Sequence, residues 1–97
     1  MDFDRDYKML IGGKLDGGSA RFDVLNPATE QVIGSVPDAG TDDLDRAIAA
    51  ARAAFPGWAA TPIEDRKAAL TAMGQAIMVN ADAFKRLLTA EQGKPHA

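Results

Sequence analysis

The chain has 97 residues, 46% of them hydrophobic and 26% charged, with a formal net charge of −3. This composition is typical of a soluble globular domain, and the acidic balance excludes the basic footprint of a nucleic-acid-binding protein. The sequence contains no cysteine, which excludes disulfides, thiolate catalysis and cysteine-ligated zinc within these residues.

Residues 1–6 carry four charges and offer little to bury, so we expect a flexible tail there. The same stretch lacks the basic and apolar regions of a signal peptide. No apolar run approaches the roughly 18 residues that a membrane span requires. We therefore expect a cytoplasmic protein that binds neither membranes nor nucleic acid.

Residues 7–38 are predicted to form a β meander of three or four short strands, over 7–11, 14–16, 21–25 and 31–36. The Gly12-Gly13 pair suits a type I′ hairpin turn, because both glycines tolerate positive φ. The Asn26-Pro27 pair is turn chemistry, since proline fixes φ and the asparagine side chain can bond its own backbone.

Residues 41–93 are predicted to form three amphipathic helices. In the first, Thr41 is the N-cap candidate, and the regular helix is expected to end at Pro56-Gly57 with Trp58 folding back over it. The apolar face expected for this helix comprises Leu44, Ile48, Ala51, Phe55 and Trp58.

The second helix is expected to start with a capping box of Thr61 and Glu64, with Pro62 at the first helical position. Its apolar stripe comprises Ile63, Leu70, Met73 and Ile77. Asn80 or Asp82 is expected to cap the third helix, and Gly93 to end it. The inward-facing residues expected there are Phe84, Leu87 and Leu88. The fold class is thus an α+β arrangement, and the meander is too short to cover three apolar stripes, which predicts a fragment of a larger protein.

Taken together and in this order, several short motifs resemble the N-terminal segment of the NAD(P)-dependent aldehyde dehydrogenase superfamily. They lie at residues 9–14, 24–29 and 32–37, at 47–55 with Trp58, in the helix of Arg66, and at 89–95. The resemblance implies that residues 7–97 form the N-terminal part of the cofactor-domain region of an α/β enzyme. Two positions depart from the family pattern, namely Leu15, where a tryptophan is usual, and Glu30, where a glycine is common.

The resemblance implies an oxidoreductase that converts an aldehyde to a carboxylic acid with NAD or NADP. Family members use a cysteine nucleophile and a glutamate that acts through water, and neither group is expected among these residues. The pairs Gly12-Gly13 and Gly17-Gly18 have the wrong spacing for a loop that cradles a pyrophosphate. We therefore expect neither catalysis nor cofactor binding by the isolated chain, which would support the cofactor domain.

The resemblance also implies a monovalent cation bound by the backbone carbonyls of Val24 and Leu25 and by the side chain of Glu91. Hard oxygen ligands suit such ions. The alternative is that Glu91 is a solvated residue in the last helical turn.

Other candidate residues have simpler structural interpretations. His96, the sole histidine, is expected in an exposed loop. Phe55 and Trp58 are expected in a core rather than a ligand pocket. The charged run at residues 64–66 is expected to be a helix first turn rather than an acid–base cluster.

Two functional hypotheses follow from these patterns. The first is an N-terminal fragment of an aldehyde dehydrogenase, whose partners are the remainder of that chain and further copies in a homo-oligomer. The second is a free-standing helical module whose exposed stripes bind a partner or a second copy of itself.

Overall fold

The computed structural model describes residues 6–95 and has four strands followed by three helices. The strands are β1 (Met9–Ile11), β2 (Lys14–Asp16), β3 (Arg21–Leu25) and β4 (Val32–Pro37). The helices are α1 (Thr41–Ala60), α2 (Ile63–Val79) and α3 (Ala81–Gln92). The predicted α+β order is therefore confirmed. Residues 1–5 of the predicted tail and His96 lie outside the described residues.

The strands pair as two separate antiparallel hairpins, β1–β2 and β3–β4. Gly12 and Gly13 have φ values of 60° and 78°, as the predicted type I′ turn requires. In the second hairpin the side-chain oxygen of Asn26 accepts a hydrogen bond from the amide of Ala28 at 2.9 Å, which is the predicted asparagine turn. Both turns thus fold according to their local chemistry.

The first helix differs from its prediction at both ends. Gly40, not Thr41, is the N-cap, and its amide donates to the Asp43 carboxylate at 2.9 Å. The helix also continues through Pro56 to Ala60. A proline inside a helix removes one backbone hydrogen bond, but the neighbouring bonds can still hold the helical path. The predicted end at Pro56-Gly57, with Trp58 folding back, is wrong.

The predicted capping box at the start of α2 is also wrong. Pro62 is the N-cap rather than the first helical residue, and no side chain caps this end. The Thr61 hydroxyl donates to the carbonyl of Gly57 at 2.8 Å instead, so it satisfies the end of α1. Glu64 forms an ion pair with Lys67 at 3.0 Å.

The boundary of the third helix agrees with the prediction. Asn80 is its N-cap residue, and the side-chain amide of Asn80 also donates to the carbonyl of Ala76 at 2.8 Å, at the end of α2. Gly93 ends α3 with φ at 76°, and its amide donates to the Thr89 carbonyl at 2.8 Å.

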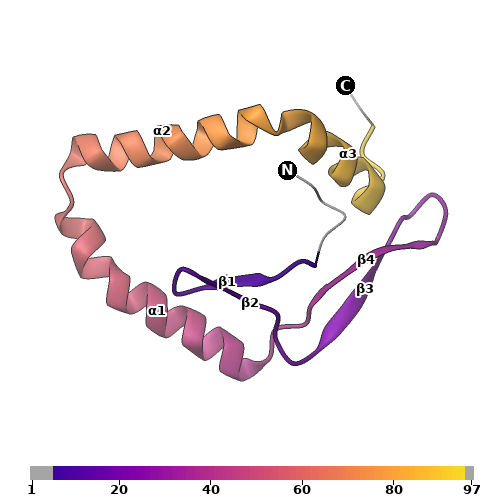
Figure 1. Cartoon of the computed structure of the whole chain (residues 1–97), viewed down its shortest axis with the longest axis horizontal. Helices are drawn as coiled ribbons and strands as arrows, with labels where there is room; N and C mark the ends of the chain where they lie inside the picture. The colour runs from indigo at the N-terminus through magenta and orange to yellow at the C-terminus, as the bar shows by residue number, and fades with distance from the viewer. Residues whose placement is uncertain (1–5, 96–97) are drawn as a thin grey trace.

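The elements follow one another around an open arch (Figure 1). Helices α1 and α2 diverge from the turn between them, β1 contacts α1, and α3 contacts α2. The radius of gyration is 16.6 Å, whereas a compact chain of this length has about 12.5 Å. The accessible surface is 7624 Å², against about 5300 Å² for a compact protein of the same mass.

No residue within 6–95 is buried, so the apolar stripes have no common core. Phe55 and Trp58, predicted to be core residues, are 67% and 46% exposed. Phe84 and Leu88, predicted to face inward, are also exposed, while Leu87 is half-buried. These predictions are wrong for this chain because no layer covers the helices. None of the helices within residues 6–95 combines the length and the hydrophobicity that a membrane span requires.

Candidate functional site

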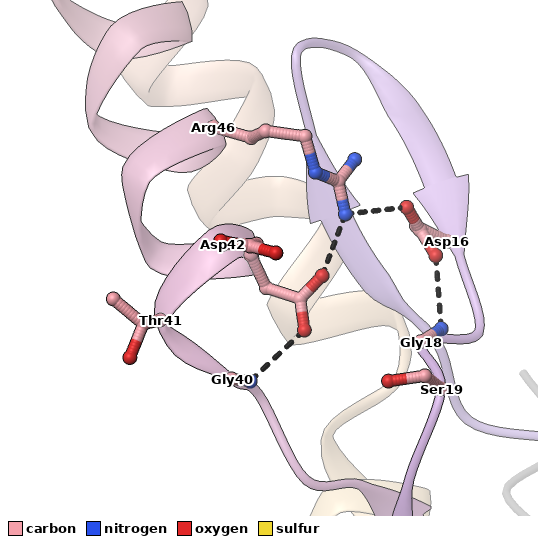
Figure 2. Close-up of a pocket in the computed structure, with 8 residues that line it drawn as sticks. Asp16, Gly18, Ser19, Gly40, Thr41, Asp42 and Arg46 are labelled. Carbon is pink, nitrogen blue, oxygen red and sulfur yellow. Dashed lines mark hydrogen bonds and ion pairs between the residues drawn. The ribbon is translucent and has the colours of Figure 1, made fainter.

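One polar cluster joins β2 to the start of α1 (Figure 2). The Nη2 atom of Arg46 lies 2.6 Å from Oδ1 of Asp43 and 2.9 Å from Oδ2 of Asp16. The second oxygen of each carboxylate accepts a backbone amide, from Gly40 at 2.9 Å and from Gly18 at 2.8 Å. A single guanidinium therefore links β2 to α1, through residues that are 30 positions apart in the sequence.

Local sequence positions each member of this cluster. Asp43 and Arg46 are three residues apart, so they lie on the same face of α1. Asp43 is the third residue of the helix, where a carboxylate can accept the N-cap amide as in half of a capping box. Asp16 ends β2 and accepts from the amide of Gly18, two residues on, as aspartate commonly does in turns.

Hydrogen bonds hold both carboxylates in their charged form. The amide of Gly18, then the guanidinium of Arg46, lowers the pKa of Asp16. The amide of Gly40, then Arg46, likewise lowers the pKa of Asp43, and the two carboxylates raise the pKa of Arg46. A carboxylate with a lowered pKa is a poor proton donor or acceptor near neutral pH. The cluster therefore suits the attachment of the hairpin to the helix and not acid–base catalysis.

An open cavity of about 450 Å³ lies over this cluster. Its lining includes three carboxylates and one cation, and the cation is already paired with two of the carboxylates. Within residues 6–95 no group of three or more histidine, cysteine, aspartate or glutamate side chains could hold a metal ion. This cavity thus lies on the outer surface of the contact between β2 and α1.

The residues predicted to bind a cation lie where the second hairpin meets α3. Val24 and Glu91 line one cavity of about 190 Å³, together with Tyr7, Ile33, Gly34, Val36 and Leu87. Leu25 is outside this lining, next to an irregularity in the pairing of β3 with β4. Carboxylate and carbonyl oxygens suit a monovalent cation. The cation at Val24, Leu25 and Glu91 stays a prediction.

The Asn-Pro turn and the end of α3 are close neighbours at this place. A Cβ atom built on Gly93 would lie 3.5 Å from Cγ of Pro27. Across the same hairpin, Arg21 donates to the Ser35 carbonyl at 2.8 Å and to the Tyr7 carbonyl at 3.2 Å. The tertiary structure thus brings three separate segments to one small region.

The glycine pairs do not form a cofactor-binding loop in this structure. Gly12 and Gly13 join β1 to β2, so a strand and not a helix follows them. A pyrophosphate cradle needs a helix N-terminus directly after the glycines. The Gly12-Gly13 pair is therefore a hairpin turn and not a cradle of this kind.

The charged run at the start of α2 is engaged locally. Glu64 forms an ion pair with Lys67, and Nε of Arg66 donates to the Thr61 carbonyl at 3.1 Å. These contacts agree with the interpretation of the run as a helix first turn.

Sequence reasoning missed the Asp16–Arg46 contact. The spacing of Asp43 and Arg46 signals a pair on one helix, but nothing local points from Arg46 to a carboxylate at the end of a strand. The contact arises because the hairpin turn packs on α1, where a Cβ atom on Gly12 would lie 3.7 Å from Cβ of Ala50. No local sequence pattern indicates that packing.

Comparison with known proteins places the chain in a family. The model of the aldehyde dehydrogenase family matches residues 15–97. The chain is 47% identical over 94 residues to glutarate-semialdehyde dehydrogenase of Pseudomonas putida, covering 96% of this chain and 20% of that protein. It is 43% identical over 89 residues to the mitochondrial acylating methylmalonate-semialdehyde/malonate-semialdehyde dehydrogenase of Homo sapiens, covering 90% of this chain and 17% of that protein.

Solved structures of the same kind share the fold. The crystal structure of succinate-semialdehyde dehydrogenase from Burkholderia pseudomallei matches with a TM-score of 0.87 and 37% identity, covering 92% of this chain and 19% of that one. An NAD-dependent benzaldehyde dehydrogenase from Corynebacterium glutamicum matches with a TM-score of 0.86 and 29% identity, covering 93% of this chain and 20% of that one. The chain thus spans about a fifth of the relatives that it matches. On these grounds, the chain belongs to the aldehyde dehydrogenase family and corresponds to an N-terminal segment of its members.

Proposed function

We propose that the chain serves as the N-terminal segment of an NAD(P)-dependent aldehyde dehydrogenase, where it supports the cofactor domain and takes no part in the chemistry. The match of residues 15–97 to the family model carries this proposal. The chain has no cysteine, whereas the family's reaction uses a cysteine nucleophile. The activity therefore resides in the parent enzyme.

The exposed stripes of the helices support a packing role. Exposed apolar patches of this extent commonly mark surfaces that another part of a protein covers. Large side chains on α1 and α2 are more than 40% exposed, among them Leu44, Phe55, Trp58, Leu70 and Met73. The four-fifths of an aldehyde dehydrogenase that this chain does not span would cover these faces.

The substrate class proposed for the parent enzyme is a semialdehyde, which carries an aldehyde at one end and an acidic group at the other. The relatives named above from Pseudomonas putida, Homo sapiens and Burkholderia pseudomallei are semialdehyde dehydrogenases. The cofactor is NAD or NADP. A cytoplasmic location is part of the proposal, and cell fractionation tests it.

A chimeric enzyme tests the packing role directly. The corresponding N-terminal segment of the Pseudomonas putida enzyme is replaced by residues 1–97 of this chain. We expect a soluble chimera that reduces NAD or NADP with glutarate semialdehyde, while the enzyme without any such segment is insoluble or inactive. The isolated chain mixed with cofactor and aldehyde is expected to show no reduction.

Matched variants keep the test specific. In the chimera, Phe55→Asp is expected to abolish soluble enzyme, because it places an unpaired charge in the face to be covered. Asp45→Asn, an exposed change on the same helix, is expected to leave the activity within about twofold. Packing support is refuted if the enzyme is equally active with and without the segment, or if the wild-type chimera fails while the enzyme with its own segment folds.

A further inference from the structure

An apolar groove lies between the turn of the β1–β2 hairpin and helix α1. Its volume is about 350 Å³. The hairpin turn at Gly12 lines one side, and alanines of α1 line the other, namely Ala47, Ala50, Ala51 and Ala54. None of the described residues in its lining has a charged or polar side chain. We refer to this feature as the hairpin groove.

The hairpin covers only part of the alanine face. The four alanines recur at spacings of three and four residues, so they share one side of α1. The hairpin turn contacts this side near Ala50, because a Cβ atom on Gly12 would lie 3.7 Å from Cβ of Ala50. Ala51 and Ala54 nevertheless stay exposed. One edge of the face is therefore covered, and the rest is open to another apolar element.

A polar link holds the hairpin side of the groove in place. The Nη2 atom of Arg46 lies 2.9 Å from Oδ2 of Asp16, the last residue of β2 (Figure 2). Arg46 directly precedes Ala47, so the link lies next to the groove. A binding surface whose parts are already in place loses less conformational entropy when a partner docks.

The opposite side of α1 has the character of a surface that faces water. The cavity on that side is lined by Asp45, Ile48, Ala49, Arg52 and Ala53. Aspartate and arginine are rarely buried without a partner. Helix α1 is therefore charged on one side and apolar on the other, and the hairpin groove lies on the apolar side.

The occupant that fits the groove is the rest of an aldehyde dehydrogenase. The fold of this chain recurs over 92% and 93% of its length in the two solved enzymes, where it makes up only 19% and 20% of the chain. Most of an enzyme chain is thus available to cover the alanine face. The uncharged lining favours an apolar element, because a charge placed against it would have no partner.

We propose that the hairpin groove is the surface through which this chain, as a separate polypeptide, docks on the remainder of an aldehyde dehydrogenase. An apolar element of the remainder lies on Ala51 and Ala54, beside the turn at Gly12. The inference rests on the proposed function and deepens it, since it names the docking surface and removes the need for a peptide bond between the two parts.

Co-expression tests the proposal. Residues 1–97 with an affinity tag are produced together with the Pseudomonas putida glutarate-semialdehyde dehydrogenase that lacks its own corresponding segment. We expect the two chains to purify as one complex that reduces NAD or NADP with glutarate semialdehyde. The truncated enzyme produced alone is expected to be insoluble or inactive.

A matched pair of substitutions tests the groove itself. Ala51→Arg is expected to lower the amount of co-purified enzyme at least about tenfold, because it places a large, unpaired cation in the groove. Ala49→Arg is the control, because it makes the same change on the same helix about 160° away, beside Asp45 and Arg52. It is expected to change the amount less than about twofold.

Far-ultraviolet circular dichroism checks that both variants keep their helices. If Ala51→Arg loses helix, Ala51→Leu replaces it and is expected to lower the amount of co-purified enzyme about fivefold, because it overfills the groove. Equal effects of the changes at positions 49 and 51 overturn the proposal. So does a wild-type chain that does not co-purify while the covalent chimera is active, and the proposed function then stands. If the chimera fails as well, both are overturned.

Discussion

Replacing Glu30 by glycine is expected to stabilise the hairpin of β3 and β4. Glu30 has φ at 59° and is the sole non-glycine residue within 6–95 with a positive φ. The left-handed conformation costs an L-residue about 1–2 kcal/mol. Glycine avoids this cost but loses about 0.5–1 kcal/mol more conformational entropy on folding than other residues do. Taking the middle of both ranges, the net gain is about 0.5–1 kcal/mol.

Hydrogen exchange at the Asn26 amide measures this gain locally. That amide donates to the Gln31 carbonyl at 2.9 Å and closes the loop that contains Glu30. A gain of about 0.5–1 kcal/mol corresponds to a two- to fivefold slower exchange when exchange follows local opening.

The control is Glu30→Ala, which removes the carboxylate but keeps the Cβ atom and hence the strain. Within residues 6–95 the Glu30 carboxylate takes part in no hydrogen bond or ion pair, so alanine is expected to leave the exchange rate unchanged. The backbone explanation is refuted if alanine slows exchange as much as glycine does, or if glycine accelerates exchange.

Two further predictions concern α1. The lowered pKa values of Asp16 and Asp43 mean that the link between β2 and α1 is complete above about pH 4 and is lost as the pH falls through those lowered values. A nuclear magnetic resonance titration of the Gly18 and Gly40 amides follows the loss of this link. Titration midpoints at or above the usual aspartate pKa would contradict the prediction. Pro56→Ala is expected to stabilise α1 by about 1–3 kcal/mol, because it restores a backbone donor inside the helix. Helicity measured by circular dichroism should rise in this variant. The control is Pro62→Ala, at the N-cap of α2, which is expected to leave the helicity unchanged. A loss of helicity in Pro56→Ala would show that the proline is needed there.

Features that depend on a few neighbouring residues could be predicted from the sequence. The turn at Gly12-Gly13, the asparagine turn at Asn26 and the left-handed cap at Gly93 each follow from the conformations and hydrogen bonds open to those residues. The predictions of a helix end at Pro56 and of a capping box at Thr61 were wrong, because several local arrangements there differ by only a hydrogen bond. Thr61 can cap α2 or satisfy the end of α1, and the structure has the second arrangement.

The sequence by itself determined the order of the strands and helices, the positions of their apolar stripes and the resemblance to the aldehyde dehydrogenases. These features rest on local propensity, periodicity and motif spacing. Only the tertiary structure decided that Arg46 reaches Asp16 and that Val24 and Glu91 border one cavity. Contacts between residues so far apart in the chain depend on how whole elements pack. The tertiary structure also left the stripes of α1 and α2 uncovered, because the layers that could bury them are not supplied by the described residues.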